Sequence, residues 1–309
     1  MKAAWLACAV LVLQGLPAPP GRMIGVGGRK LHLLCSGSGG PTVILVAGGS
    51  AYSIDWALVQ PRVALGGRVC SYDRAGLAWS DTGPADETVE QTSSDLHALL
   101  RSTGERGPYV LVGASIGGLY IRAYQRQFPS EVTGLVFTNS SNRVGFAANG
   151  VSGLLWNLSE DQIRSAFPLP PPPASPPATE GEPFNRLPAA FQAARLHADV
   201  KLWEKGRHTP ALPDSLLSWR REFLREFDET ETGTPLGALP VVVISSDPIV
   251  ADPAHRTRDG AAARLAFLST DTTFVVATGS GHEIHLYQPD TVIRAIETIR
   301  AVVRSRPAR

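Results

Sequence analysis

The segment that most constrains this chain runs from residue 109 to residue 120, with the sequence YVLVGASIGGLY. Its first four residues have strand character, and a helical pattern follows over residues 119–128. Between them lies a G-x-S-x-G motif centred on Ser115. Between a strand and a helix, such a motif holds its serine on a sharp turn with the hydroxyl exposed. The pattern therefore predicts Ser115 as a nucleophile. The alternative is a glycine-rich turn that binds phosphate or only saves space.

Alternating strand and helix signals around this motif predict an α/β fold. Short apolar runs bounded by glycine, proline or polar residues indicate strands, and an uninterrupted apolar run is typical of a strand buried on both faces. Such alternation favours a mostly parallel sheet with helices on both faces. The expected strands are 23–26, 30–35, 42–46, 68–72, 109–112, 132–138, 241–244 and 272–277, and the expected helices are 54–65, 88–100, 119–128 and 289–303.

Residues 140–239 interrupt this alternation. They contain helix-like stretches at 159–167, 189–205 and 215–227, together with a proline-rich run, FPLPPPP, at 167–173. Such a run can form neither a helix nor a central strand. We therefore expect a core built from residues 23–139 and 240–309, with 140–239 inserted as a helical, Pro-rich lid over Ser115. A separate small domain or a flexible insert is the alternative.

A serine nucleophile requires a base, and the base requires an acid that orients it. The expected chain order after such a turn is serine, acid and histidine. His282 lies in a glycine-flanked loop, GSGHEIH, after the last predicted strand, with His285 as its competitor. Asp247 closely follows the strand at 241–244, and Asp252 is the alternative acid. A turn or a helix cap is the structural interpretation of either aspartate.

Two backbone N–H groups are candidates for stabilising the oxyanion of an acyl-transfer reaction. One belongs to Ile116, which follows the nucleophile, and the other to Gly49, just after the strand at 42–46. Both positions match the usual donors beside a serine at a strand-to-helix turn. Tyr52 and Trp56 are candidate residues of the substrate pocket.

Composition and motif content argue against several other function classes. The net charge is +1, with no basic stripe interleaved with aromatic residues, so a nucleic acid partner is not expected. The sequence has no C-x-x-C or H-E-x-x-H spacing for a metal and no G-x-G-x-x-G or Walker loop for a nucleotide. We therefore expect a small-molecule substrate, no metal and no cofactor.

The first 22 residues have the character of a signal peptide or an N-terminal hydrophobic segment. Lys2 precedes an apolar run that ends at Leu13. This run has the length of a signal-peptide core and is too short to cross a bilayer. We expect an exported protein, periplasmic or secreted, without an integral membrane span. A cytoplasmic or N-terminally anchored protein is the alternative.

Three linked motifs occur in order along the chain: YDRAGLAWS at 72–80, GPYVLVGASIGGLY at 107–120 and GSGHEIH at 279–285. In these motifs the chain resembles bacterial serine hydrolases of the α/β-hydrolase superfamily, over roughly residues 30–139 and 239–303. The resemblance implies a mostly parallel, eight-stranded sheet with a helical lid. Ala47, Ala78 and Ala114 depart from the usual residues. Asn139 stands where many relatives carry an aspartate after the sixth strand, and an amide cannot serve as the acid.

The resemblance also implies a disulfide. In the strand order of α/β-hydrolases, the strand that ends at Cys35 lies beside the strand that carries Cys70, so a bridge between them is geometrically possible. A disulfide would agree with export to an oxidising compartment. Two buried free thiols are the alternative.

The sequence as a whole predicts a serine hydrolase that cleaves a small or medium carboxylic ester through an acyl-enzyme. An amide or peptide hydrolase of the proline-iminopeptidase type is a related alternative. A non-catalytic binding protein on the same fold is an alternative from another class. Dehalogenases and epoxide hydrolases of this superfamily use an aspartate as the nucleophile. Because this chain has Ser115 at that position, the resemblance disfavours both activities.

Overall fold

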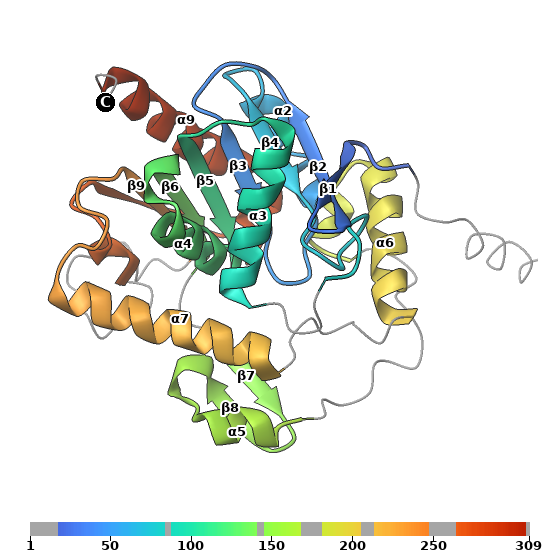
Figure 1. The fold of residues 1–309 in the computed structure, drawn as a ribbon, viewed down its shortest axis with the longest axis vertical. Helices are drawn as coiled ribbons and strands as arrows, with labels where there is room; N and C mark the ends of the chain where they lie inside the picture. The colour runs from blue at the N-terminus through green and yellow to red at the C-terminus, as the bar shows by residue number, and fades with distance from the viewer. Residues whose placement is uncertain are drawn as a thin grey trace, which may run out of the picture.

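The apolar strand segments build one eight-stranded sheet in the computed structural model, which describes residues 18–83, 88–140, 145–167, 181–204, 213–246 and 264–306. The strand order is β1-β2-β4-β3-β5-β6-β9-β10 (Figure 1). The pairs β1–β2 and β2–β4 are antiparallel and all the others are parallel. The α/β-hydrolase fold predicted from the sequence is confirmed. The strands are β1 (Arg22–Val26), β2 (Arg29–Ser36), β3 (Val43–Val46), β4 (Val69–Tyr72), β5 (Tyr109–Ala114), β6 (Val132–Thr138), β9 (Val241–Ser245) and β10 (Thr272–Val276).

Helices cover both faces of this sheet because its central strands are apolar on both sides. Side chains alternate between the faces of a strand, and β3 sends Ile44 to one apolar cluster and Val43 and Leu45 to another. The first cluster packs under α3 (Val89–Thr103) and α4 (Gly117–Gln127), and the second under α9 (Pro289–Ser305) (Figure 1). Among the described residues, no helix is both long and apolar enough to cross a bilayer.

The predicted helix over 54–65 is divided in two. A 3-10 turn, η1, covers Ser53–Trp56, and a short helix, α2, covers Gln60–Val63. Pro61 lies in the first turn of α2. Because proline has no N–H to donate, it is tolerated at the start of a helix but not in its interior. The proline therefore begins a new helix and does not continue one.

The segment between β6 and β9 contains a hairpin that the sequence interpretation missed. Strands β7 (Gly145–Ala148) and β8 (Val151–Leu154) pair antiparallel. Asn149 and Gly150 join them with φ of 48° and 80°. An Asn-Gly pair is the strongest short-range hairpin signal because both residues tolerate positive φ. The signal was therefore present in the sequence, ahead of the first helix-like stretch predicted for this segment.

Three α-helices also belong to this segment: α5 (Glu160–Ser165), α6 (Ala189–Glu204) and α7 (Pro213–Thr232). Helix α7 extends beyond the predicted 215–227. Two ion pairs fasten it to α4: Arg126 contacts Glu222 at 2.6 and 2.7 Å, and Arg122 contacts Glu229 at 2.8 Å. The carboxylate of Glu222 is buried. Helix α7 is therefore attached to the core by charged contacts as well as by apolar packing.

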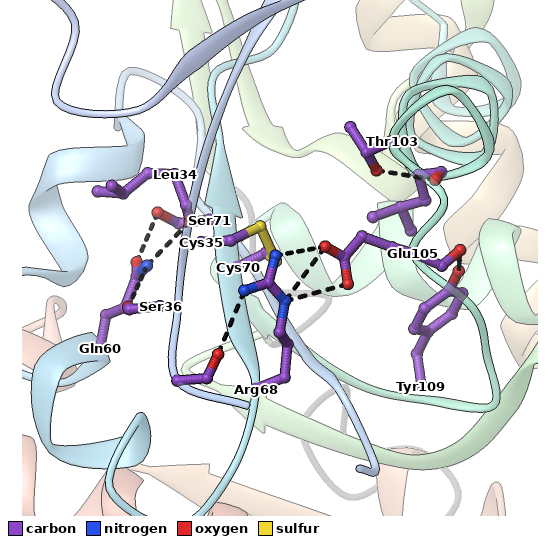
Figure 2. Close-up of a disulfide and its surroundings, with 12 residues drawn as sticks. Leu34, Cys35, Ser36, Gln60, Arg68, Cys70, Ser71, Thr103, Glu105 and Tyr109 are labelled. Carbon is purple, nitrogen blue, oxygen red and sulfur yellow. Dashed lines mark hydrogen bonds and ion pairs between the residues drawn. A yellow bond between two sulfur atoms is a disulfide. The ribbon is translucent and has the colours of Figure 1, made fainter. Parts of the chain in front are cut away.

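Cys35 and Cys70 form the disulfide that the family resemblance implies. They are directly opposite each other in the antiparallel pairing of β2 and β4. Figure 2 shows the guanidinium of Arg68 beside this bridge, where it contacts both carboxylate oxygens of Glu105 at 2.5 to 3.2 Å. The carboxylate and the two sulfur atoms lie within 4.8 Å of one another. Because the sulfurs are bonded to each other, this group is a cross-link and not a metal site.

Candidate active site

Ser115 lies on the tight turn between β5 and α4. Its φ is 53°, in the left-handed region that costs a residue other than glycine roughly 1–2 kcal/mol. Two hydrogen bonds hold this conformation: the Ser115 N–H donates to the carbonyl of Thr138 at 2.9 Å, and the Ser115 carbonyl accepts from the N–H of Gly118 at 3.0 Å. The side chain remains partly accessible. The turn thus has the geometry that the motif predicts for a nucleophile.

The glycines of the motif allow strand and helix to approach closely. A Cβ at Gly113 would lie 2.7 Å from the backbone of Gly117, and a Cβ at Gly117 would lie 2.5 Å from the carbonyl oxygen of Val46. Real Cβ atoms do not approach backbone atoms so closely. Glycine is therefore required at both positions to bring β3, β5 and the start of α4 together around Ser115.

The loop after β3, residues 48–50, lies against this turn. A Cβ at Gly48 would be 3.2 Å from Cβ of Ser115 and 3.8 Å from its hydroxyl oxygen, and one at Gly49 would be 3.7 Å from the side chain of Ile116. Within the described part of the chain, the N–H groups of Gly49 and Ile116 donate to no protein acceptor. The two predicted oxyanion donors thus lie on segments that meet beside Ser115. We refer to residues 48–50 as the oxyanion loop.

Arg74 binds the backbone of the oxyanion loop and of the residue before it. Its guanidinium donates to the carbonyl of Ala47 at 2.8 Å and also to the carbonyl of Gly49. The preceding Asp73 is buried, accepts from the N–H of Ser53 at 2.7 Å and pairs with the buried His32 at 2.8 Å. The sequence identified the YDRAG segment only as part of a family motif. In the structure, its Asp73 and Arg74 hold the backbone around the nucleophile in place.

The loop between β10 and α8 (Ile284–Tyr287) carries His282, whose side chain is exposed. The His282 carbonyl accepts from the side-chain amide of Asn139 at 2.9 Å, and Asn139 directly follows Thr138, the partner of the Ser115 N–H. No hydrogen bond joins Ser115 and His282, both of which the structure describes. The loop is thus anchored next to the nucleophile turn through the end of β6.

Asp247 and Asp252, the two candidate acids, lie outside the described residues. The strand that leads toward them, β9, ends next to β6 in the sheet. Both therefore remain predictions from the sequence.

His285, the competing histidine, is buried in packing. It is 2% exposed, and its ring lies 4.5 Å from the ring of Trp56, measured between centroids. Burial lowers the pKa of His285. Trp56 and Tyr52 are both fully buried. Their place in a substrate pocket stays a prediction from the sequence. The predicted helix over 54–65 gave no indication of what would cover Trp56.

Tyr52 is covered by a charged contact between α6 and the core. Arg195 of α6 pairs with the buried Asp55 at 3.2 Å and donates to the carbonyl of Ser50, in the oxyanion loop, at 3.2 Å. The Tyr52 hydroxyl donates to Asp199 at 2.5 Å. Burial raises the pKa of Asp55 to about 7, against the opposing charge of Arg195. No local sequence signal could reveal this contact, because its partners lie far apart in the chain.

Comparisons with known proteins agree with this fold. An uncharacterised protein of Schizosaccharomyces pombe is 30% identical over 159 residues, which span 42% of this chain and only 30% of that relative. A thermophilic esterase from Thermogutta terrifontis superposes with a TM-score of 0.64 at 20% identity, covering 91% of this chain and 98% of the esterase. An enol-lactonase from Burkholderia xenovorans LB400 superposes with a TM-score of 0.60 at 16% identity, covering 91% and 100%.

Identities this low between solved structures and the chain show the fold alone. The match to the family is broader: the sequence pattern of the alpha/beta hydrolase family extends over residues 43–295. It includes the oxyanion loop, the serine turn and the histidine loop. From its sheet order, its serine turn and this match, the chain belongs to the alpha/beta hydrolase family.

Proposed function

We propose that this protein is a serine hydrolase that cleaves a small or medium carboxylic ester through an acyl-enzyme. The observation that carries the proposal is Ser115, held at positive φ on the turn between β5 and α4, with the backbone N–H groups of Gly49 and Ile116 beside it. Strain of this kind persists only where surrounding structure sustains it, and it is concentrated at functional sites.

The proposed reaction has two halves. The Ser115 hydroxyl oxygen attacks the ester carbonyl carbon while His282 takes the hydroxyl proton. The N–H groups of Gly49 and Ile116 donate to the oxyanion. The tetrahedral intermediate expels the alkoxide, which takes the proton from His282 and leaves as the alcohol. Water then attacks the acyl-enzyme by the same route and releases the carboxylic acid and free Ser115.

Asp247 is the proposed acid that orients His282, with Asp252 as its alternative. A carboxylate that accepts from the imidazole N–H fixes the tautomer and stabilises the imidazolium. Replacing each aspartate in turn by asparagine separates the two. The variant that loses kcat by about 10⁴-fold marks the acid, because an asparagine at the acid position favours the wrong tautomer.

The ester preference and the lid are further parts of the proposal. Two structures of the same fold are named as an esterase and an enol-lactonase, and a lactone is a cyclic ester. We propose that residues 140–239 act as the lid. Support comes from Arg195 of α6, which contacts the carbonyl of Ser50 in the oxyanion loop. Export is proposed from the Cys35–Cys70 disulfide, since such bonds persist in oxidising compartments.

The deciding experiment is labelling with a fluorophosphonate probe, followed by turnover of p-nitrophenyl esters of increasing acyl length. We expect wild type to be labelled and Ser115→Ala not to be. His282→Gln should abolish turnover, whereas His97→Gln should not. His97 is a suitable control because it stacks on Phe128, at the opposite end of α4 from Ser115. A folded wild type that stays unlabelled would refute the proposal and favour a binding protein.

A further inference from the structure

We infer that Asn139 is a positioning residue for His282, an inference that rests on the proposed function. Asn139 is the first residue after β6, and its backbone N–H donates to the carbonyl of Ile244 in β9 at 2.9 Å. Its φ is 45°, which turns its side chain out of the strand path. Asparagine tolerates this left-handed conformation better than most residues. The side chain then bridges β9 and the loop that carries the base.

The orientation of the Asn139 amide follows from its partners. Its oxygen accepts from the backbone N–H of Ser246 at 2.9 Å, a group that can only donate. Its nitrogen donates to the carbonyls of His282 at 2.9 Å and Gly281 at 3.4 Å, which can only accept. Both ends of the amide are therefore assigned without ambiguity. Only a side chain with a donor and an acceptor can join these two segments.

This bridge acts on the backbone of the base. The His282 carbonyl also accepts from the N–H of Ile284 at 3.1 Å, so both hydrogen bonds fix the peptide that follows the histidine. The imidazole itself is exposed. Its placement relative to Ser115 thus depends on where the loop backbone is held. Asn139 directly follows Thr138, whose carbonyl accepts from the Ser115 N–H, so neighbouring residues hold the nucleophile turn and the histidine loop.

An aspartate at position 139 could not replace the asparagine. It would retain the oxygen that accepts from Ser246 but would place a carboxylate oxygen where the amide nitrogen lies 2.9 Å from the His282 carbonyl oxygen. Two acceptors at that distance repel each other. We therefore expect Asn139→Asp to displace the histidine loop, although it introduces a carboxylate close to the base.

The test compares three variants with wild type. Asn139→Gly retains the positive φ but removes the side-chain amide. Asn139→Asp retains the size and shape of the side chain but replaces the donor nitrogen with an acceptor oxygen. Gln60→Ala is the matched control, since the side-chain amide of Gln60 also joins two segments, donating to the carbonyl of Leu34 at 2.9 Å and accepting from the hydroxyl of Ser71 at 2.7 Å, beside the Cys35–Cys70 bridge. All rates are normalised to the concentration of sites that react with the fluorophosphonate probe, which removes any loss of folded protein.

We expect both Asn139 variants to lose kcat by about 10- to 100-fold per reactive site, with KM within threefold of wild type, because misplacing a catalytic group by about 1 Å has such an effect. Asn139→Asp should also move the acidic limb of the kcat/KM profile to higher pH, since a carboxylate near His282 favours the imidazolium. Asn139→Gly should lower the plateau without moving the limb. Gln60→Ala should match wild type per reactive site.

Two results would overturn the inference while leaving the proposed function intact: wild-type kcat per reactive site in Asn139→Gly, or undiminished kcat in Asn139→Asp. If wild type itself is not labelled at Ser115, the proposed function fails and the inference fails with it. A loss of reactive sites with unchanged kcat per site would show that Asn139 only stabilises the fold, and it would also refute a positioning role.

Discussion

The Cys35–Cys70 disulfide allows a quantitative prediction about stability. The bridge closes a loop of 35 residues between β2 and β4. In the chain-entropy model, a loop of that length constrains the unfolded chain by about 4 kcal/mol at 25 °C. For 309 residues the entropy of unfolding near the melting temperature is about 0.65 kcal/mol/K. The double variant Cys35→Ala/Cys70→Ala should therefore melt about 6 °C below wild type.

Differential scanning calorimetry with and without a reductant measures this difference. Reduced wild type should melt at the temperature of the double variant, and the double variant should not respond to the reductant. Activity should be retained, because Cys70 lies near the beginning of β4 and the candidate site lies beyond the opposite, carboxyl end of that strand. A difference below about 1 °C would show that the loop is already constrained in the unfolded chain, which would refute the entropic reasoning.

Three further predictions concern the candidate site. Gly117→Ala should lower the free energy of unfolding by about 1–3 kcal/mol in urea titrations, because its Cβ would overlap backbone atoms, whereas Gly25→Ala, with open space around it, should change it by less than about 0.5 kcal/mol. Arg74→Lys should lower kcat about tenfold in ester turnover, because one ammonium cannot replace a planar guanidinium that donates to two carbonyls. Burial raises the pKa of Asp55 to about 7, so its protonated form stabilises the fold at low pH and that contribution is lost as pH rises from about 4 to 7. Urea titrations of Asp55→Asn should therefore show a change in unfolding free energy between pH 4 and pH 7 that is smaller than that of wild type by up to about 4 kcal/mol. The same change in both proteins would show that Arg195 already holds the carboxylate ionised.

The strands and the serine turn could be predicted because their signals are local. All eight predicted strands are present, since each is a short apolar run bounded by residues that interrupt it. The turn at Ser115 could be identified for the same reason, because motif, strand and helix are contiguous. The β7–β8 hairpin also has a local signal, Asn149-Gly150, although the sequence prediction assigned no strand there.

The contacts between distant segments could not be predicted. Asp55 and Arg195 meet only because the segment after β6 folds back onto the oxyanion loop. Neither residue lies in a recognisable motif. Asn139 shows the same limit in another form: its residue type excluded it as an acid, but its role as a bridge becomes visible only once β9 and the His282 loop are placed next to it.

The strand order explains why these contributions converge on one serine. Strand β5 lies between β3 and β6, so the turn at its carboxyl end has a neighbouring strand end on each side. The β3 side contributes the oxyanion loop, and the β6 side contributes Thr138, which holds the Ser115 N–H, and Asn139, which holds the His282 loop. A net hydrogen bond contributes about 1 kcal/mol, comparable to the cost of the positive φ at Ser115. The strained turn therefore depends on its two neighbouring strands, and a substitution at the carboxyl end of either β3 or β6 should change the position of the nucleophile.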